Sequence, residues 1–199
     1  MLDPPVLTPE DADALLWYAV AAVRSGLERR PVPGIEVPTA AALKAIGATF
    51  VTLERGRRLL GCIGTIDAVR PLYEDAMTNA YKSAFADPRL PAVTPDDYAA
   101  MDVKVSVLGP TEPMAAATRD ELVAGLEPGR DGVLIVADGF RATFLPSVWP
   151  RVASTGEFVE LLLKKGRPSG GWVPGLRAFR YRASEYTQSG PRRPVTASG

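Results

Sequence analysis

The sequence contains no histidine and a single cysteine, Cys62. Without histidine the chain cannot by itself build a Ser-His-Asp triad, a Cys-His pair or a zinc site of the common kind. One cysteine cannot form an internal disulfide, which fits a reducing compartment, so a cytoplasmic protein is expected. We expect no cofactor and no metal site, because no run of carboxylates signals a site for a hard cation either.

The chain also lacks net charge and long apolar runs. Its 23 Lys and Arg residues balance its 23 Asp and Glu residues, so no global charge attracts nucleic acid or a membrane. No apolar run approaches the roughly 20 residues of a membrane span, and the acidic, proline-rich start is not expected to be a targeting peptide. Arginines near the C-terminus are interpreted as a solvated strand face and tail, with nucleic acid an unlikely partner: Arg177, Arg180, Arg182, Arg192 and Arg193.

The 199 residues, of which 46% are hydrophobic and 23% charged, suit one substantial core or two small lobes that share one. Thr8 followed by Pro9 predicts the start of a helix that ends at Gly26. Trp17 and Tyr18 on this helix are interpreted as packing residues, because aromatic side chains mostly serve cores.

One order of elements occurs twice. Residues 48–108 and residues 132–183 each predict a hairpin, a helix and a strand. We infer an internal duplication: two α+β units whose strands are mainly antiparallel and flanked by helices, either as one curved sheet or as a large and a small lobe. A single domain is expected over residues 1–187, followed by a flexible tail at 188–199.

The cysteine lies between two glycines, Gly61 and Gly64, in an apolar stretch. Glycines inside a strand interrupt pairing and mark a bulge or a close approach of another backbone. A thiol held there can be exposed at a sheet edge, with backbone N–H groups beside it. The alternative is that Cys62 is a small buried hydrophobic residue, and both interpretations stay open.

The GCIG motif at residues 61–64 resembles the core of the LRGCIG signature of the AMMECR-one family. The family usually has arginine where Leu60 stands, and Arg57 or Arg58 are the neighbouring charges. Further matches follow in the same order: Asn79-Ala80, Asp87-Pro88-Arg89 with Pro91, Val105–Leu108, Gly132, Phe144-Leu145-Pro146 with Val148, and Lys164 with Gly166. The resemblance covers most of residues 10–186 and implies an AMMECR-type domain.

What the resemblance implies about function is limited. Members are cytoplasmic or nuclear α+β proteins without a settled activity. In prokaryotes the domain is often associated with a Memo-type and a radical-SAM protein, which implies Memo-like and radical-SAM partners in a shared modification or redox pathway.

Two functions therefore stand side by side. In the first, a cysteine-dependent enzyme or accessory subunit uses Cys62 as nucleophile or thiol ligand, and backbone N–H groups around Gly61 and Gly64 bind an anionic group. The surrounding candidates for substrate binding are Asn79, Lys82, Asp87 and Arg89. In the second, the domain is a non-catalytic module that binds a protein or small ligand on the glycine-flanked strand. Asp87-Pro88-Arg89 also fits a plain helix stop with an arginine that clamps the turn.

Overall fold

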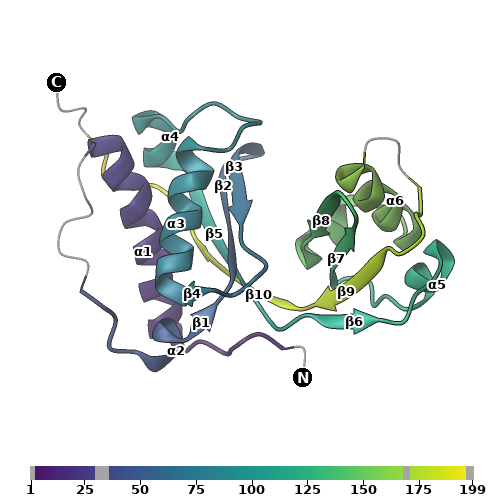
Figure 1. Cartoon of the computed structure of the whole chain (residues 1–199). Helices are drawn as coiled ribbons and strands as arrows, with labels where there is room; N and C mark the ends of the chain where they lie inside the picture. The colour runs from purple at the N-terminus through teal and green to yellow at the C-terminus, as the bar shows by residue number, and fades with distance from the viewer. Residues whose placement is uncertain (1–2, 30–35, 168–170, 196–199) are drawn as a thin grey trace. The chain divides into compact units, whose positions relative to one another are not determined.

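The computed structural model describes residues 3–29, 36–167 and 171–195 of the chain. The described residues fall into two compact units, which we treat separately (Figure 1). The larger unit takes its residues from Pro5–Leu108 and Ser184–Gly199, and the smaller unit from Met1–Pro4 and Gly109–Ala183.

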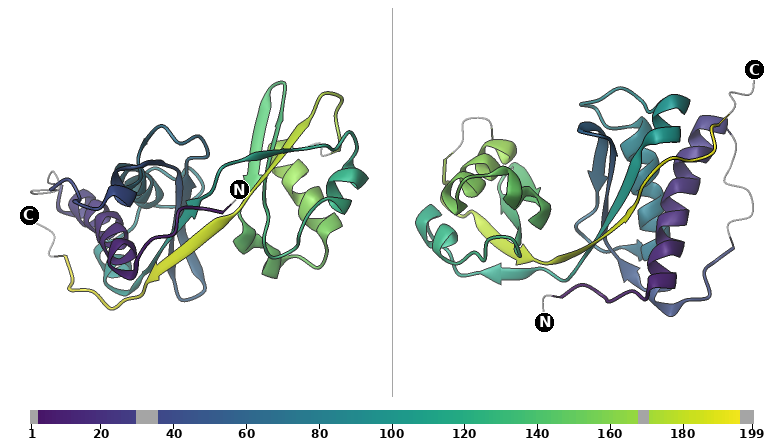
Figure 2. Two further views of the ribbon diagram at one scale, coloured as in Figure 1. Left: turned by 90° about the horizontal axis from the view of Figure 1, so that it is seen from below. Right: turned by 180° about the vertical axis from the view of Figure 1, so that it is seen from behind.

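The larger unit is a four-stranded antiparallel sheet with two long helices. The sheet has the order β10-β5-β2-β3, and a two-stranded sheet joins β1 and β4. Its elements are α1 (Pro9–Glu28), α2 (Ala41–Lys44), β1 (Ile46–Gly47), β2 (Thr49–Arg55), β3 (Arg58–Gly64), β4 (Arg70–Pro71), α3 (Leu72–Phe85), α4 (Pro95–Ala100), β5 (Asp102–Leu108) and β10 (Ala183–Gln188). Helices α1 and α3 lie side by side over one face of this sheet (Figures 1 and 2).

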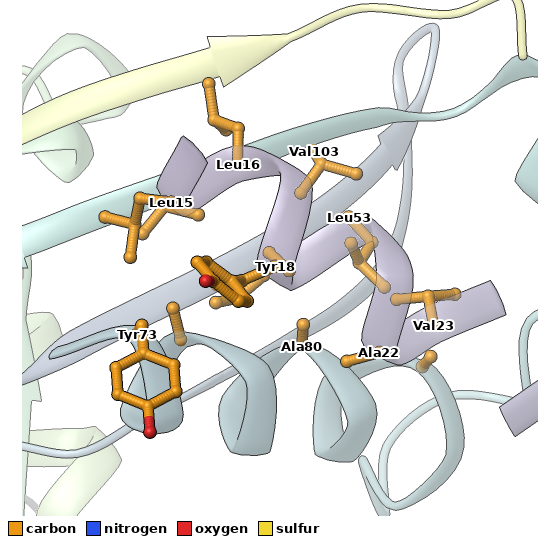
Figure 3. Close-up of a cluster of buried hydrophobic side chains, with 14 of the residues drawn as sticks. Leu15, Leu16, Tyr18, Ala22, Val23, Leu53, Tyr73, Ala80 and Val103 are labelled. Carbon is orange, nitrogen blue, oxygen red and sulfur yellow. The ribbon is translucent and has the colours of Figure 1, made fainter. Parts of the chain in front are cut away.

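The core of the larger unit lies between these helices and the sheet. Leu53 of β2 and Val103 of β5 are fully buried, and α1 covers them with Leu15, Leu16 and Val23 (Figure 3). The face of α3 that packs against α1 carries a stripe of small residues, which lets the two helices come close. These residues are Ala76, Ala80 and Ala84.

Helix α1 runs past the residue expected to stop it. Thr8 caps its start as predicted, since the Asp11 N–H donates to Thr8 Oγ1 at 3.1 Å. The helix continues through Gly26 to Glu28 and ends on Arg29, which has a left-handed conformation (φ 51°). The glycine serves contact instead: a Cβ on Gly26 would lie 2.2 Å from the Phe85 ring of α3.

The smaller unit is a second four-stranded antiparallel sheet, with the order β6-β9-β7-β8. Fully buried Phe158 and Leu162 of α6 pack against Val133 and Ile135 of β7, and the Trp149 ring stacks on Phe158 at 3.9 Å between centroids. Its elements are β6 (Glu112–Met114), α5 (Arg119–Ala124), β7 (Gly132–Ala137), β8 (Phe140–Phe144), the 3-10 helix Pro146–Arg151, α6 (Thr155–Gly166) and β9 (Arg177–Tyr181).

The α+β class with antiparallel sheets flanked by helices is thus confirmed, with two four-stranded sheets and a two-stranded one instead of one continuous sheet. The expected hairpin, helix and strand are β2, β3, α3 and β5 in one sheet and β7, β8, α6 and β9 in the other. In each sheet the strand after the helix pairs with the first hairpin strand. This common order is what a duplication predicts, although a shared ancestry of the two halves stays a prediction.

The end of the chain departs from expectation. The strand expected at the end of residues 132–183 is β9, which ends at Tyr181. A further strand that was not expected, β10, follows it and pairs with β5 of the other sheet. The tail expected to be flexible from 188 is packed as far as Val195, which is 6% exposed in the core of the larger unit. Arg192 explains part of this, since its guanidinium donates to the Met101 and Gln188 carbonyls.

No helix in the described ranges is both long enough and apolar enough to cross a bilayer.

Candidate functional site

Cys62 lies on β3, an edge strand of the four-stranded sheet in the larger unit, on the face away from α3. Its neighbour Gly61 faces α3 so closely that a Cβ there would lie 1.9 Å from the Ser83 carbonyl oxygen. Because successive strand residues point to opposite faces, the Cys62 side chain is directed to the other side of the sheet. There its cross-strand partner Thr52 donates from Oγ1 to Sγ at 3.4 Å. The thiol residue is half-buried.

An ion pair satisfies both backbone groups of Cys62 on the open edge of β3. The Cys62 N–H donates to Asp87 Oδ2 at 3.0 Å, and Arg89 Nη2 donates to the Cys62 carbonyl at 2.8 Å. Arg89 grips Asp87 with two parallel bonds, Nε to Oδ1 at 2.8 Å and Nη2 to Oδ2 at 2.6 Å. Asp87 and Arg89 thus make the hydrogen bonds to the Cys62 backbone that a neighbouring strand would make if β3 lay inside the sheet.

The pair is electrostatically strong. The Asp87 side chain is buried, and its hydrogen bond with Arg89 holds the pKa of its carboxyl well below the usual range against the opposing effect of burial. Backbone donors from Cys62 and Arg89 act in the same direction. The pKa of the Arg89 guanidinium is raised, first by the hydrogen bond with Asp87 and also by interaction with Cys62. A positive group is therefore held at the Cys62 backbone.

A hydroxyl from α3 is inserted between β2 and β3 next to the cysteine. The Ile63 N–H donates to Ser83 Oγ at 2.9 Å, and the same hydroxyl donates to the Val51 carbonyl at 2.8 Å. Val51 and Ile63 are register partners, so Ser83 relays a bond that the two strands would otherwise make directly. Helix α3 is thereby tied to the ladder beside the thiol.

Replacing Ser83 with alanine tests this relay. We expect the free energy of unfolding to fall by about 1.5 kcal/mol, because the Ile63 N–H and the Val51 carbonyl lose their shared partner inside the protein. Urea denaturation measures it, with the exposed Ser147 replaced by alanine as the matched control. An unchanged unfolding midpoint for Ser83→Ala would mean that the strands close directly over the gap.

Asn79 belongs to a second, buried polar cluster on the same helix. It is 2% exposed, and its amide donates to the Thr49 carbonyl at 3.0 Å and to Asp75 Oδ2 at 2.9 Å. The same carboxylate oxygen accepts from the N–H and hydroxyl of Thr49, both at 2.8 Å. Arg70 Nε lies 3.4 Å from Asp75 Oδ1 and offsets the buried charge. The cluster fastens α3 to the start of β2 and does not contact Cys62.

The predicted residues thus lie in four places. The structure brings Gly61, Cys62, Asp87 and Arg89 together at one edge, while Asn79 lies in the neighbouring cluster. Lys82 is exposed on α3 and makes no ion pair with any residue in the described ranges. Gly64 admits the Phe50 ring, since a Cβ there would lie 2.1 Å from it.

Arg58 does not supply the charge that the Leu60 position lacks, and Arg57 is exposed at the hairpin turn. Leu60 is 5% exposed and belongs to the core, and the guanidinium of Arg58 binds Asp97. The cation next to Cys62 is Arg89, which arrives from the turn after α3.

Two residues at the thiol could not be assigned from the sequence, Thr52 and Ser83. Thr52 shows itself only through the cross-strand register, which depends on the bulge between Leu53 and Glu54. For Ser83 there was a partial signal: it lies four residues after Asn79 on α3, so the helical repeat places the two residues on one face of the helix.

The geometry limits the chemistry open to this site. The two N–H groups closest to the thiol, those of Cys62 and Ile63, are bonded to Asp87 and Ser83, so the expected oxyanion site is not free there. Asp87 is fixed to Arg89 and holds its proton poorly, which makes it a weak base. Across the described residues, no group of three Asp, Glu or Cys side chains could hold a metal ion.

The structure defines a class of α+β protein with two four-stranded antiparallel sheets. An edge strand of one sheet carries a half-buried thiol, and an arginine binds the backbone of that strand. Residues 16–186 match the AMMECR1 family, and the chain belongs to that family.

Relatives share most of this length. A protein from Aeropyrum pernix is 31% identical over 206 residues, covering 98% of this chain and 86% of its own, and one from Thermotoga maritima is 33% identical over 157 residues, covering 77% and 84%. The crystal structure of an uncharacterised protein from Pyrococcus horikoshii superposes with a TM-score of 0.76 at 26% identity, covering 96% of this chain and 98% of that one.

Proposed function

We propose that the domain works through Cys62 as a reactive thiol, either as a cysteine-dependent enzyme or as the thiol-bearing accessory subunit of a modification or redox pathway. One observation carries the proposal: at Cys62 the Thr52 hydroxyl donates to the sulfur, while the Arg89 guanidinium is held at the same residue by a hydrogen bond to its carbonyl. Donors and positive charge beside a sulfur stabilise negative charge on it, and thiols in such surroundings are the reactive ones.

The missing parts of an active site favour the accessory role. The sequence has no histidine, and the carboxylate beside the thiol is held by Arg89. A partner would then supply the acid–base groups, and the Memo-like and radical-SAM proteins implied by the family resemblance are the proposed partners. Strand addition at Cys62, which a docking module would use, conflicts with the ion pair that already occupies that edge.

The rate of alkylation tests the thiol directly, because Cys62 is the one cysteine of the sequence. Iodoacetamide labelling at pH 7, followed by intact-mass spectrometry, should be faster in the native protein than in the urea-unfolded chain, although folding half-buries the residue. Thr52→Val should slow native labelling about threefold, since it removes a donor to the sulfur without changing the size of the side chain.

Thr187→Val on exposed β10 is the matched control and should leave the rate unchanged. Native labelling slower than that of the unfolded chain, with no effect of Thr52→Val, would mark Cys62 as structural and leave the non-catalytic binding module as the remaining function.

A further inference from the structure

A cavity of about 570 Å³ opens on the side of α1 that does not enter the core. Core residues of α1 recur at the helical period, and the face between them carries Trp17, Arg24 and Glu28. Tyr98 of α4 and the segment after β10, with Arg192 and Arg193, close the cavity. Figure 2 shows this last segment running back past α1. All of these residues belong to the larger unit, and none contacts Cys62.

Trp17 forms an aromatic wall of the cavity. The interpretation of Trp17 as a packing residue is wrong, because its side chain is 52% exposed and only Tyr18 of the pair enters the core. The two rings meet edge to face at 5.1 Å between centroids, and Tyr18 is itself fixed by a hydrogen bond from its hydroxyl to the Glu36 carbonyl at 2.7 Å. The indole is therefore held in place with much of its surface free.

The Tyr98 side chain brings a hydroxyl to the wall of the cavity. Tyr98 is 4% exposed and lines the cavity, and its hydroxyl makes no hydrogen bond to any of the described residues. Burial raises the pKa of Tyr98, so the hydroxyl keeps its proton and remains a donor. The charges of Arg192 and Arg24 lower this pKa, and the charge of Glu28 raises it.

Positive charge exceeds negative charge around the cavity. Arg24, Arg192 and Arg193 line it against the single carboxylate of Glu28. Arg24 binds Glu28 through Nε alone, at 2.7 Å, and more than half of its side chain is exposed. Arg192 is fixed by carbonyls, whereas Arg193 is exposed. An anion therefore meets two accessible guanidinium groups and a hydroxyl donor.

We propose that this cavity binds a small planar aromatic anion, whose ring lies against Trp17 and whose acidic group lies between Arg24 and Arg193 and accepts a hydrogen bond from Tyr98. The volume is in the range of small-molecule sites, which combine apolar walls with a few converging polar groups. Aromatic stacking and charge-assisted hydrogen bonds from arginine supply the two halves of the recognition.

Isothermal titration of the full chain tests both halves with matched probes. Adenosine monophosphate carries an aromatic ring and a phosphate, and 1-naphthoate carries an aromatic ring and a carboxylate. Adenosine lacks the negative charge, and ribose 5-phosphate lacks the aromatic ring. We expect at least one of the two complete probes to bind saturably, and adenosine and ribose 5-phosphate to bind about tenfold more weakly than that probe. Tighter binding of adenosine monophosphate identifies a phosphate ligand, and tighter binding of 1-naphthoate a carboxylate.

Three variants localise the binding. Trp17→Ala and Arg24→Gln should each weaken the better complete probe about tenfold, and Tyr98→Phe about fivefold. Tyr98→Phe should leave the melting temperature unchanged, because its hydroxyl has no partner within the described structure. Arg57→Gln, at an exposed turn of the same unit, is the control and should bind as wild type.

The proposal is overturned if neither complete probe binds saturably up to about 1 mM, if adenosine binds as well as its phosphate, or if Trp17→Ala and Tyr98→Phe bind like wild type. The outcome is independent of Cys62, so thiol labelling and probe binding succeed or fail separately.

Discussion

Replacing Gly61 with alanine is expected to lower the free energy of unfolding by about 3 kcal/mol, more than any other single substitution proposed for this protein. The new Cβ would lie 1.9 Å from the Ser83 carbonyl oxygen, and this neighbour is backbone of α3. Helix α3 cannot simply retreat, because its other side packs against α1 through the small residues around Ala80. Urea denaturation followed by circular dichroism measures the loss.

Alanine substitutions at two other glycines serve as comparisons for the loss of stability. Gly64→Ala meets the half-buried Phe50 ring, a side chain that can turn away, so its cost should be clearly smaller. Gly156→Ala in α6 meets no atom closer than 3.4 Å and should be neutral or slightly stabilising, because alanine favours helix. Equal midpoints for Gly61→Ala and Gly156→Ala would mean that α3 does not approach β3 this closely.

Replacing Asp87 with alanine is expected to lower the free energy of unfolding by about 2.5 kcal/mol at pH 7. The change leaves the Cys62 N–H without its acceptor and the Arg89 guanidinium without its counter-charge. This loss is smaller than is usual when one partner of a fully buried ion pair is removed. About half of the Arg89 side chain is exposed, so water can solvate the guanidinium that is left unpaired. Asp13→Ala, at an exposed position of α1, is the matched control and should change stability little.

The effect of Asp87 depends on pH in a defined direction. The folded protein lowers the pKa of this carboxyl below its unfolded value near 4. Its stabilisation is therefore fully present above about pH 4 and is lost as the pH falls further toward the folded pKa. The stability gap between wild type and Asp87→Ala should narrow from pH 7 to pH 3, as denaturation at both values will show. A gap that stays constant would contradict the Asp87–Arg89 pair.

The candidate site was only partly foreseeable from the residues. The glycine-flanked cysteine predicts a close approach at β3, and Gly61 provides it. The Asp87-Pro88-Arg89 turn follows α3, as a helix stop predicts, and it also binds the Cys62 backbone. Substrate binding by Asp87 and Arg89 stays a prediction. The N–H groups beside the thiol, which were expected to be free, already donate hydrogen bonds. A buried carboxylate and a hydroxyl lie next to this strand, and buried polar groups form hydrogen bonds with one another.

Trp17 shows where pattern and packing diverge. An aromatic residue in an amphipathic helix is expected to enter the core, yet Trp17 falls on the helix face shared with Arg24 and Glu28. The helical repeat therefore contained the signal for its exposure. That Tyr98 and the segment after β10 would meet this face to form a cavity had no local signal, since their sequence positions are far apart.

The sequence by itself determined the local structure: the cap at Thr8, the two hairpins, and the alternation of strands and helices that gives the α+β class. These features depend on residues a few positions apart, whose hydrogen bonds and side-chain directions follow from the backbone. Only the tertiary structure decided that β10 joins the first sheet, that Gly26 admits Phe85, and that Arg89 reaches Cys62. Such contacts join distant segments, and their formation depends on the shape and charge of surfaces that exist only once the chain has folded.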